Sequence, residues 1–314
     1  MKICKKLAVL LLCLLAVVSC FPLSAQAAGS IDLTHACVLS LSYQDNGTPL
    51  SGAPFTLYRV ADVDANGNLT ATGAFARFPV DIRGKNDAVW NTLATTLESY
   101  VLRDQVPALD RQTTDGAGTL TFAEQTPGLY LVLGSRHTQN GRYYDAAPFL
   151  TLLPALNAEQ TIWVYTVTAN VKFDSEPVPE NPAEITRSVQ KIWKDAQNET
   201  ARPKEISVQL LRDGTIADTV TLSAENSWHY TWTHLDGASR WHVVETAPNG
   251  YTVEITRDGD AFEIVNTDTT HNPPPENHLP QTGQLWWPVP VLIAAGLALL
   301  VLGLLARRRR HETA

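Results

Sequence analysis

The sequence is poor in cysteine, and the few cysteines are unevenly placed. Three of the four lie within the first 20 residues, which leaves Cys37 alone in the rest of the chain. A single thiol excludes an intramolecular disulfide framework, so the folded chain needs another source of stability. Motifs for substrate turnover are also lacking: there is no G-x-S-x-G, no phosphate-binding loop and no paired-carboxylate motif. We therefore expect no enzyme activity toward a substrate and no cofactor.

The N-terminus has the features of a secretory signal. Three lysines precede an apolar core at residues 7–18, and Ala25-Gln26-Ala27 forms an A-x-A cleavage site. Residues 1–27 are therefore predicted to be a signal peptide that is removed on export. An alternative is the sequence Val17-Val18-Ser19-Cys20, which is typical of a lipoprotein signal in which Cys20 is acylated.

The C-terminus carries an apolar run at residues 285–306, followed by four arginines at 307–310. Twenty-two helical residues span about 33 Å, enough to cross the hydrocarbon core of a bilayer. The arginines after this predicted transmembrane helix place the C-terminus in the cytoplasm. Shortly before the run stands a pentapeptide made of Leu279, Pro280, Gln281, Thr282 and Gly283.

Together, the pentapeptide, the span and the basic tail at residues 279–314 resemble the LPxTG cell-wall sorting signal of Gram-positive surface proteins. The resemblance implies that a sortase attacks the carbonyl of Thr282, breaks the bond to Gly283 and transfers the chain to an amine. That amine belongs to a peptidoglycan precursor or to another pilin subunit. The expected localisation is secreted and covalently anchored to the cell wall, with a membrane-spanning precursor before sorting. An ordinary single-pass membrane protein is the alternative.

The segment between the two predicted cuts is strongly acidic. Of the 24 basic residues, three lie before Ala28 and four after Thr282, so 17 remain; of the 32 acidic residues, 31 remain. The resulting net charge of −14 repels nucleic acid and anionic membranes. Neither is expected as a partner.

Proline-rich segments divide this acidic region. Residues 174–183 are predicted to be a linker and residues 268–278 a stalk, both extended and exposed. The flanking regions, 28–173 and 184–267, alternate short strand patterns with turn signals, which favours an all-β fold of tandem Ig-like or prealbumin-like β-sandwiches. In the first domain, apolar residues at helical spacing predict a helical insertion near 87–103, with an N-cap at position 86 or 87.

Both domains resemble a known family. Segments 50–60, 128–132 and 147–150 of the first domain resemble the SpaA/CnaB-type domains of Gram-positive pilins and adhesins. The second domain resembles a CnaB-type domain over its whole length. The matching segments are 189–195, 202–203, 208–214, 228–232, 244–245 and 250–251. Seven strands are expected there, at 185–193, 205–212, 219–222, 228–232, 241–245, 251–255 and 261–266.

Three of these seven strands carry a polar residue on an otherwise apolar face. Lys191 falls in line with Val189 and Trp193, Glu245 with Trp241 and Val243, and Asn266 with Phe262 and Ile264. Because alternate residues of a strand share a face, all three side chains are predicted to point into the core. Left unpaired there, the amine or the carboxylate would cost several kcal/mol.

Burial favours a neutral Lys191 amine and a protonated Glu245. The amine can then attack the Asn266 carboxamide while Glu245 polarises its carbonyl and shuttles protons, and ammonia leaves. The product is an intramolecular isopeptide bond, which is what CnaB-type domains form. The alternative is a buried Lys191–Glu245 ion pair with Asn266 only hydrogen-bonded. The first domain has apolar residues on the corresponding strands, 37–41 and 129–133, so no isopeptide bond is expected in it.

Lys172 is a further candidate. Residues 169–172 resemble the pilin motif in which a lysine after V-x-P is the nucleophile for the next subunit's threonine, although Val171 replaces the proline here. The alternative is a surface lysine at the end of a strand.

No metal site is expected. Residues 62–67 begin like a calcium-binding EF-hand loop, but the twelfth position is Gly73 instead of a glutamate, which favours a hairpin turn. His229, His234 and His242 lie on neighbouring predicted strands, yet no cysteine or carboxylate completes a ligand set. We expect these three histidines to be exposed.

The sequence therefore predicts a sortase-anchored structural protein of the cell surface, a pilin-like subunit or stalk stiffened by one isopeptide bond. The alternative is a monomeric wall-anchored adhesin that binds a host or cell-surface ligand through its first domain. In that case the helix-bearing insertion at 71–113 is the expected binding site.

Overall fold

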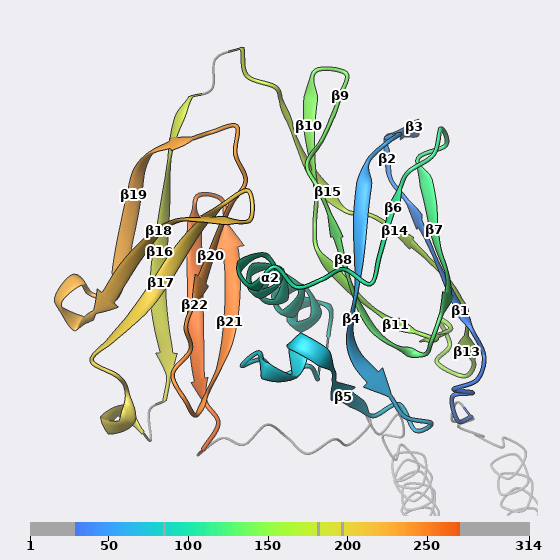
Figure 1. Cartoon of the computed structure of the whole chain (residues 1–314), viewed down its shortest axis with the longest axis horizontal. Coiled ribbons are helices and arrows are strands. Elements are labelled where there is room, and N and C mark those ends of the chain that lie inside the picture. Colours follow the sequence, from blue (N-terminus) through green and yellow to red (C-terminus); the bar gives the residue numbers. More distant parts are fainter. Residues whose placement is uncertain (1–28, 84–85, 181–182, 196–197, 271–314) are drawn as a thin grey trace, which may run out of the picture. The chain divides into compact units, whose positions relative to one another are not determined.

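The computed structural model describes residues 29–83, 86–180, 183–195 and 198–270 (Figure 1). The predicted signal peptide, the sorting signal at 279–314 and the apolar run at 285–306 lie outside these residues. Among the described residues, no helix is both long and apolar enough to span a membrane. The described chain is mostly β-sheet with one α-helix, in agreement with the predicted β-rich class with a helical insertion.

The first domain stacks two main sheets. The first sheet has the order β14-β1-β7, with β14 parallel and β7 antiparallel to the central strand. Its strands are β14 (Thr166–Asn170), β1 (Cys37–Ser42) and β7 (Thr119–Gln125). The second sheet has the order β11-β8-β4-β5, and a short strand, β6, also pairs with β4. Its strands are β11 (Phe149–Leu153), β8 (Gly128–Gly134), β4 (Pro54–Val63), β5 (Leu69–Ala71) and β6 (Asp110–Thr113).

The single α-helix, α2 (Asp87–Asp104), begins and ends as the residue types predict. The side chain of Asn86 accepts a hydrogen bond from the backbone N–H of Val89, which caps the N-terminus. At the other end Gln105 adopts a left-handed conformation and its N–H bonds the carbonyl of Val101. The helix covers the face of β8 and β4 that points away from the first sheet. Strand β8 is therefore buried on both faces, which explains its unbroken apolar run.

A third small sheet, β15-β10-β9, includes part of the segment that was predicted to be a linker. Residues 174–177 were expected to be an extended connector, but β15 (Phe173–Pro177) pairs antiparallel with β10 (Arg142–Ala146), which also pairs with β9 (His137–Gln139). Phe173 packs against the core of the first domain and makes edge contacts with the rings of Tyr43 and Tyr144. Burial of this aromatic ring, which local composition does not reveal, extends the first domain into the proline-rich segment.

The remaining short elements connect these sheets. They are β2 (Gln44–Asp45), β3 (Thr48–Pro49), β12 (Ala155–Leu156), β13 (Trp163–Val164) and the 3-10 turn η1 (Gly73–Arg77). The segment that begins like an EF-hand is the turn of the β4–β5 hairpin. There the carboxylate of Asp64 accepts hydrogen bonds from the backbone N–H groups of Asn66 and Asn68. The hairpin prediction is therefore confirmed.

The second domain is a sandwich of a four-stranded and a three-stranded sheet, and all seven predicted strands are present. The four-stranded sheet, β19-β16-β22-β21, consists of β19 (His229–Asp236), β16 (Glu184–Lys194), β22 (Ala261–Asp268) and β21 (Tyr251–Asp258). The three-stranded sheet, β18-β17-β20, consists of β18 (Thr215–Ser223), β17 (Glu205–Arg212) and β20 (Trp241–Glu245). Two short 3-10 turns, η2 (Glu199–Ala201) and η3 (Ala224–Asn226), lie in the loops.

The core of the second domain lies between these two sheets. Its buried residues alternate along each strand, as the period of a β-strand requires. The first and last strands, β16 and β22, lie side by side and run parallel, so the domain begins and ends in the same sheet.

Candidate functional site

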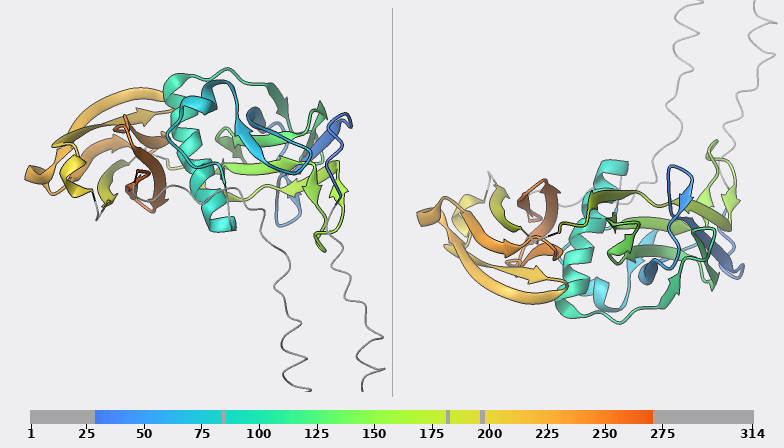
Figure 2. Two further views of the ribbon diagram at one scale, coloured as in Figure 1. Left: turned by 90° about the horizontal axis from the view of Figure 1, so that it is seen from below. Right: turned by 90° about the horizontal axis from the view of Figure 1, so that it is seen from above.

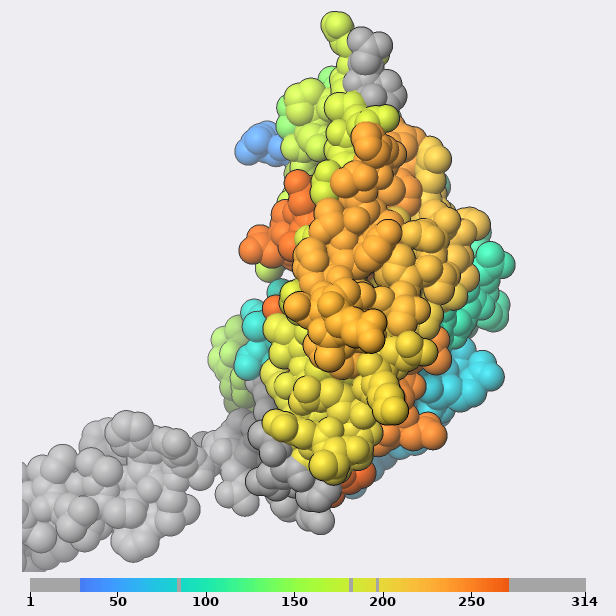
Figure 3. All heavy atoms as spheres, turned by 90° about the vertical axis from the view of Figure 1, so that its left-hand side faces the viewer, coloured from blue at the N-terminus to red at the C-terminus, as the bar shows by residue number. Residues whose placement is uncertain are grey.

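The three polar residues singled out by strand parity point into the core of the second sandwich. Lys191 lies on β16, and Asn266 lies two residues beyond Ile264, its partner across the parallel ladder to β22. Glu245 is the last residue of β20, in the opposing sheet. The exposed fractions of Lys191, Glu245 and Asn266 are 3%, 0% and 0%, so water does not reach them. Figure 3 shows one outer face of this sandwich, in yellow and orange, as a continuous surface.

The amine and the carboxyl group are in direct contact. Lys191 Nζ lies 3.3 Å from Glu245 Oε2, and both side chains are completely buried. The same nitrogen lies 3.4 Å from the carbonyl oxygen of Ile264 and 4.6 Å from the centre of the Trp193 ring. The lysine is thus held between its own sheet and the carboxyl group of the opposite sheet.

Burial shifts the protonation of this pair. It lowers the pKa of Lys191 from 10.5 to about 8, against the attraction of Glu245. It also raises the pKa of Glu245 above its ordinary value, which the nearby amine and the Asn266 amide oppose. Both shifts move the pair from an ion pair toward a neutral amine beside a carboxylic acid.

Apart from the 3.3 Å ionic contact of Glu245 Oε2 with Lys191 Nζ, four polar atoms at this site have no hydrogen-bond partner among the described residues. They are Oε1 and Oε2 of Glu245 and Oδ1 and Nδ2 of Asn266. A buried polar atom without a partner costs on the order of 1–3 kcal/mol, and such atoms are rare in folded proteins. The buried site thus contains an amine, a carboxyl group and a carboxamide without hydrogen-bond partners. These are the groups that an acyl transfer between side chains requires.

Aromatic rings close one end of the site. Trp193, two residues after the lysine, makes edge contacts with the rings of Trp228 and Tyr251 at centroid distances of 5.2 and 5.3 Å. The hydroxyl of Tyr251 donates to Asp195, which is also paired with Arg202. This layer separates the amine from solvent at the end of β16.

The first domain lacks such a set. Cys37, Leu39 and Leu41 are the buried residues of β1, and Leu129 and Leu131 are buried on β8. The thiol of Cys37 is free, and burial raises its pKa to about 11, so it stays protonated and weakly reactive. The described part of the first domain offers no buried amine for a bond like that of the second domain.

The other predicted site residues fall in two places. Lys172 is exposed between β14 and β15, where its carbonyl accepts a hydrogen bond from the backbone of Ala147. Leu279, Pro280, Gln281, Thr282 and Gly283 lie outside the described residues. No group of three or more potential metal ligands occurs in the described ranges.

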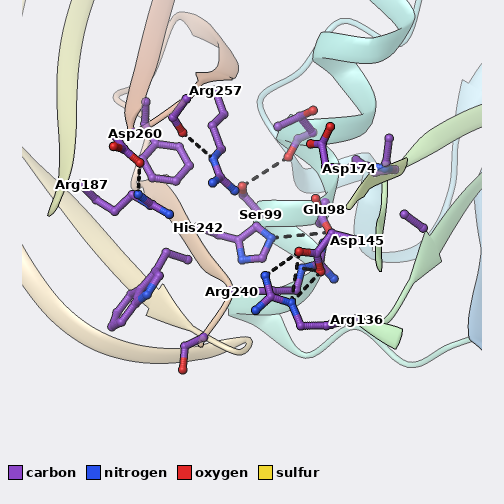
Figure 4. Close-up of a pocket in the computed structure, with 18 of the residues that line it drawn as sticks. Glu98, Ser99, Arg136, Asp145, Asp174, Arg187, Arg240, His242, Arg257 and Asp260 are labelled. Carbon is purple, nitrogen blue, oxygen red and sulfur yellow. Dashed lines mark hydrogen bonds and ion pairs between the residues drawn. The ribbon is translucent and has the colours of Figure 1, made fainter. Parts of the chain in front are cut away.

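A second polar cluster, which the sequence did not reveal, lies where α2 and the β9–β10 hairpin meet the second sandwich (Figure 4). It lines a cleft of about 660 Å³. Glu98 of α2 contacts Arg240 at 3.1 Å and His242 at 3.6 Å. Asp145 contacts Arg136 at 2.5 Å and Arg240 at 3.5 Å. The contacts of Glu98 with Arg240 and His242 and of Asp145 with Arg240 join the two sandwiches, whereas the Arg136–Asp145 pair lies within the first.

His242 and Glu98 face each other in this cluster. The expectation that His242 is exposed is wrong, because its side chain is only 12% exposed and faces Glu98; His229 and His234 are exposed as expected. The signal for Glu98 was its position in line with Ala94 and Val101, an acid on the apolar face of the helix. Burial raises the pKa of Glu98, but the histidine and the arginine outweigh burial and hold this pKa below its ordinary value.

Two family models match consecutive parts of the chain. The family model for the N-terminal domain D1 of Gram-positive pilin subunits matches residues 26–171, and the model for the Cna protein B-type domain matches residues 187–267. The chain carries a pilin-like domain followed by a Cna B-type domain. The candidate cross-linking site lies entirely within the Cna B-type domain.

Individual relatives are more distant. The collagen adhesin of Staphylococcus aureus is 34% identical over 101 residues, which cover 30% of this chain and only 8% of the adhesin. The full-length major pilin SpaD of Corynebacterium diphtheriae is 14% identical, with 76% of this chain and 99% of that chain covered and a TM-score of 0.30. A single B repeat unit of the Staphylococcus aureus collagen-binding protein is 17% identical, with 74% and 98% covered and a TM-score of 0.26. With overall scores this low, the domain assignment rests on the two family models.

Proposed function

We propose that the protein is a structural component of a Gram-positive cell surface, a pilin-like subunit or stalk. Its Cna B-type domain is stiffened by an isopeptide bond between Lys191 and Asn266. The observation that carries this proposal is the buried contact between Lys191 and Glu245 beside the unsatisfied carboxamide of Asn266. The domain families support the cell-surface role.

The bond forms by acyl transfer between two side chains. The neutral amine of Lys191 attacks Cγ of Asn266 while the Glu245 carboxyl donates its proton to the developing oxyanion. Glu245 then returns as a base, takes a proton from the attacking nitrogen and delivers it to Nδ2. As the Cγ–Nδ2 bond breaks and ammonia leaves, the carbonyl re-forms and its oxygen returns its proton to the Glu245 carboxylate, so Glu245 ends protonated, as it began. No external oxidant or cofactor is needed, and the fixed contact of the groups replaces most of the entropic cost of a bimolecular reaction.

The cross-link would change both stability and mechanics. It closes a loop of 76 residues, which by the entropy of loop closure is worth roughly 4–5 kcal/mol. It also joins the first and last strands of the domain, which already lie side by side. Pulling force along the chain would then pass through a covalent bond instead of the hydrogen-bonded ladder. The isopeptide bond would therefore supply the covalent cross-link that disulfides supply in other exported proteins.

Anchoring is the second part of the proposal. The pentapeptide ending at Gly283, with its apolar run and arginines, would be cleaved after Thr282 by a sortase. The acyl group would pass to a peptidoglycan precursor or, in a polymer, to the exposed Lys172 of another copy. The predicted result is a secreted protein that is covalently fixed to the wall.

An adhesin is the second candidate, favoured by the match to a collagen adhesin. The expected ligand site was the helix-bearing insertion of the pilin-like domain. In the structure, much of α2 is occupied by contacts with the first-domain sheet and with the second sandwich. A ligand would therefore have to use other parts of that insertion, which makes the structural role the better supported one.

Intact-protein mass spectrometry of residues 28–282 tests the cross-link. One bond lowers the mass by about 17 Da through loss of ammonia. Glu245→Gln, which keeps the size of the side chain but removes its acid, should retain the full mass. A wild-type protein at full mass would rule out the proposed reaction and leave the Lys191–Glu245 ion pair as the correct interpretation.

A further inference from the structure

The helix of the pilin-like domain closes one open side of the Cna B-type sandwich. Strand β20 is an edge of the three-stranded sheet, and β21 is an edge of the four-stranded sheet. Helix α2 packs against both of these edge strands (Figure 2). It therefore contacts each of the two sheets whose facing side chains meet at the candidate cross-link.

On the four-stranded sheet, two outward-facing N–H groups of β21 bond to the pilin-like domain. The N–H of Ile255 donates to Thr96 Oγ1 of α2 at 2.8 Å, and the N–H of Val253 donates to the carbonyl of Pro79 at 2.7 Å. The Thr96 side chain is fully buried. The outward-facing N–H groups of an edge strand normally bond to water or to another chain. Here they bond to the pilin-like domain, which fixes the position of β21. Val253 is the ladder partner of Asn266, which places this attachment one strand away from the carboxamide.

On the three-stranded sheet, the contact reaches Glu245 itself. Arg103 Nη1 of α2 donates to the backbone carbonyl of Glu245 at 3.3 Å. The preceding residue, Val244, is fully buried in the apolar cluster that surrounds α2. Because consecutive side chains of a strand point to opposite faces, seating Val244 against the helix directs the side chain of Glu245 into the sandwich.

The reacting groups are divided between the sheets in the same way. Lys191 and Asn266 come from the four-stranded sheet and Glu245 from the three-stranded sheet. The separation of the sheets at this end therefore sets the distance from the acid to the amine and the carboxamide. We propose that α2 acts as a clamp that sets this separation, so that the isopeptide bond forms rapidly only after the pilin-like domain has docked on the Cna B-type domain.

This inference rests on the proposed function, since it concerns the timing of the same reaction. The order of the chain favours it, because the pilin-like domain is synthesised first and domains generally fold as units. The clamp would then be ready when the second sandwich emerges. A misplacement of about 1 Å in a reaction between held groups can slow it by about 100-fold, so loosening the clamp should be visible in the rate.

The test follows the loss of ammonia over time in freshly synthesised protein. Residues 28–282 are made in a cell-free system, samples are quenched in acid at intervals, and the linked fraction is read by intact mass. Thr96→Val removes the acceptor for the β21 N–H, and Arg103→Gln replaces the guanidinium with a shorter amide that ends well before the position of Nη1, the atom that donates to the Glu245 carbonyl. Each is expected to slow linking by about tenfold or more. Thr96→Ser, which keeps the hydroxyl, and Asn91→Ala, on the exposed side of α2, should link at the wild-type rate.

Near-UV circular dichroism of the tryptophans checks that each variant is folded. A clamp changes the rate without changing which groups titrate, so the pH profile of linking should keep its midpoints in both slow variants. Wild-type rates in folded Thr96→Val and Arg103→Gln would overturn the clamp while leaving the cross-link intact. A wild-type protein that never loses ammonia would instead overturn the proposed function, so the two failures are distinguishable. A slow Thr96→Ser would also count against the clamp, because its hydroxyl is retained.

Discussion

Replacing Lys191 with methionine should reveal how much of the stability of the Cna B-type domain is covalent. Methionine has a similar length, fills the same volume and carries no charge, so it avoids leaving an unpaired buried amine. Burial raises the pKa of Glu245, and removal of the nearby amine takes away a cause that lowers it, so both favour the neutral carboxyl group. The substitution therefore removes the proposed bond with little other disturbance.

The expected loss follows from the size of the closed loop. A 76-residue loop corresponds to roughly 4–5 kcal/mol of stability. For a domain of 60–100 residues, 1 kcal/mol shifts Tm by about 4–8 °C, so Lys191→Met should melt on the order of 20–30 °C lower than the linked wild type. Differential scanning calorimetry of residues 28–282 measures this shift, and intact mass reports the linked state of each sample.

The matched control is Lys194→Met, which lies on the same strand. The Lys194 side chain is 57% exposed, and its ion-pair partner among the described residues is the exposed Glu254 at 3.7 Å. Its Tm should stay within a few degrees of the wild type, because exposed ion pairs contribute about 0–1 kcal/mol. The reasoning is refuted if the wild type is linked by mass and Lys191→Met nevertheless melts within about 5 °C of it.

Four further outcomes are expected. The rate of linking should have a bell-shaped pH profile, because the mechanism needs one proton shared by the Lys191–Glu245 pair. Above about pH 8 the pair loses this proton, and at low pH it binds a second one that keeps the amine charged. In unlinked Asn266→Ala, stability should rise with pH between about 8 and 10.5, because the unfolded chain binds more protons there, as denaturant titrations can check. Glu98→Gln should destabilise the chain at neutral pH by about 2–4 kcal/mol in urea and should abolish the part of the wild-type stability that is lost when acid protonates Glu98. If the protein polymerises, wall extracts should show a high-mass ladder on a denaturing gel that Lys172→Ala abolishes; a ladder that survives the substitution argues against this nucleophile.

Much of the fold follows from local patterns. Helix α2 combines a 3.6-residue apolar period with Asn86, a side chain suited to cap its first turn, so its position is visible in the sequence. The strands of the Cna B-type domain are short, alternate regularly and are bounded by turns. The boundary of the first domain was less accessible, because β15 depends on a ladder to β10 and on the burial of Phe173, neither of which leaves a local signal.

The candidate site was also only partly predictable from the sequence. Strand parity alone was enough to predict that Lys191, Glu245 and Asn266 point inward, because side chains of a strand alternate with a period of two residues and a single polar residue among apolar ones stands out. Parity could not bring the three residues together, since they lie 54 and 21 positions apart along the chain. That required the parallel ladder of β16 with β22 and the packing of the opposing sheet.

The sequence by itself determined the order of segments, the inward direction of the three polar side chains and the pentapeptide that predicts anchoring. Only the tertiary structure decided that the helix of the first domain packs against the edge strands of the second. The ion pairs of Glu98 and the bonds of Thr96 and Arg103 reach residues more than 100 positions away, to edges that exist only once both sheets are assembled. Local periodicity reports which side of an element is buried, and the partner that buries it is decided by packing.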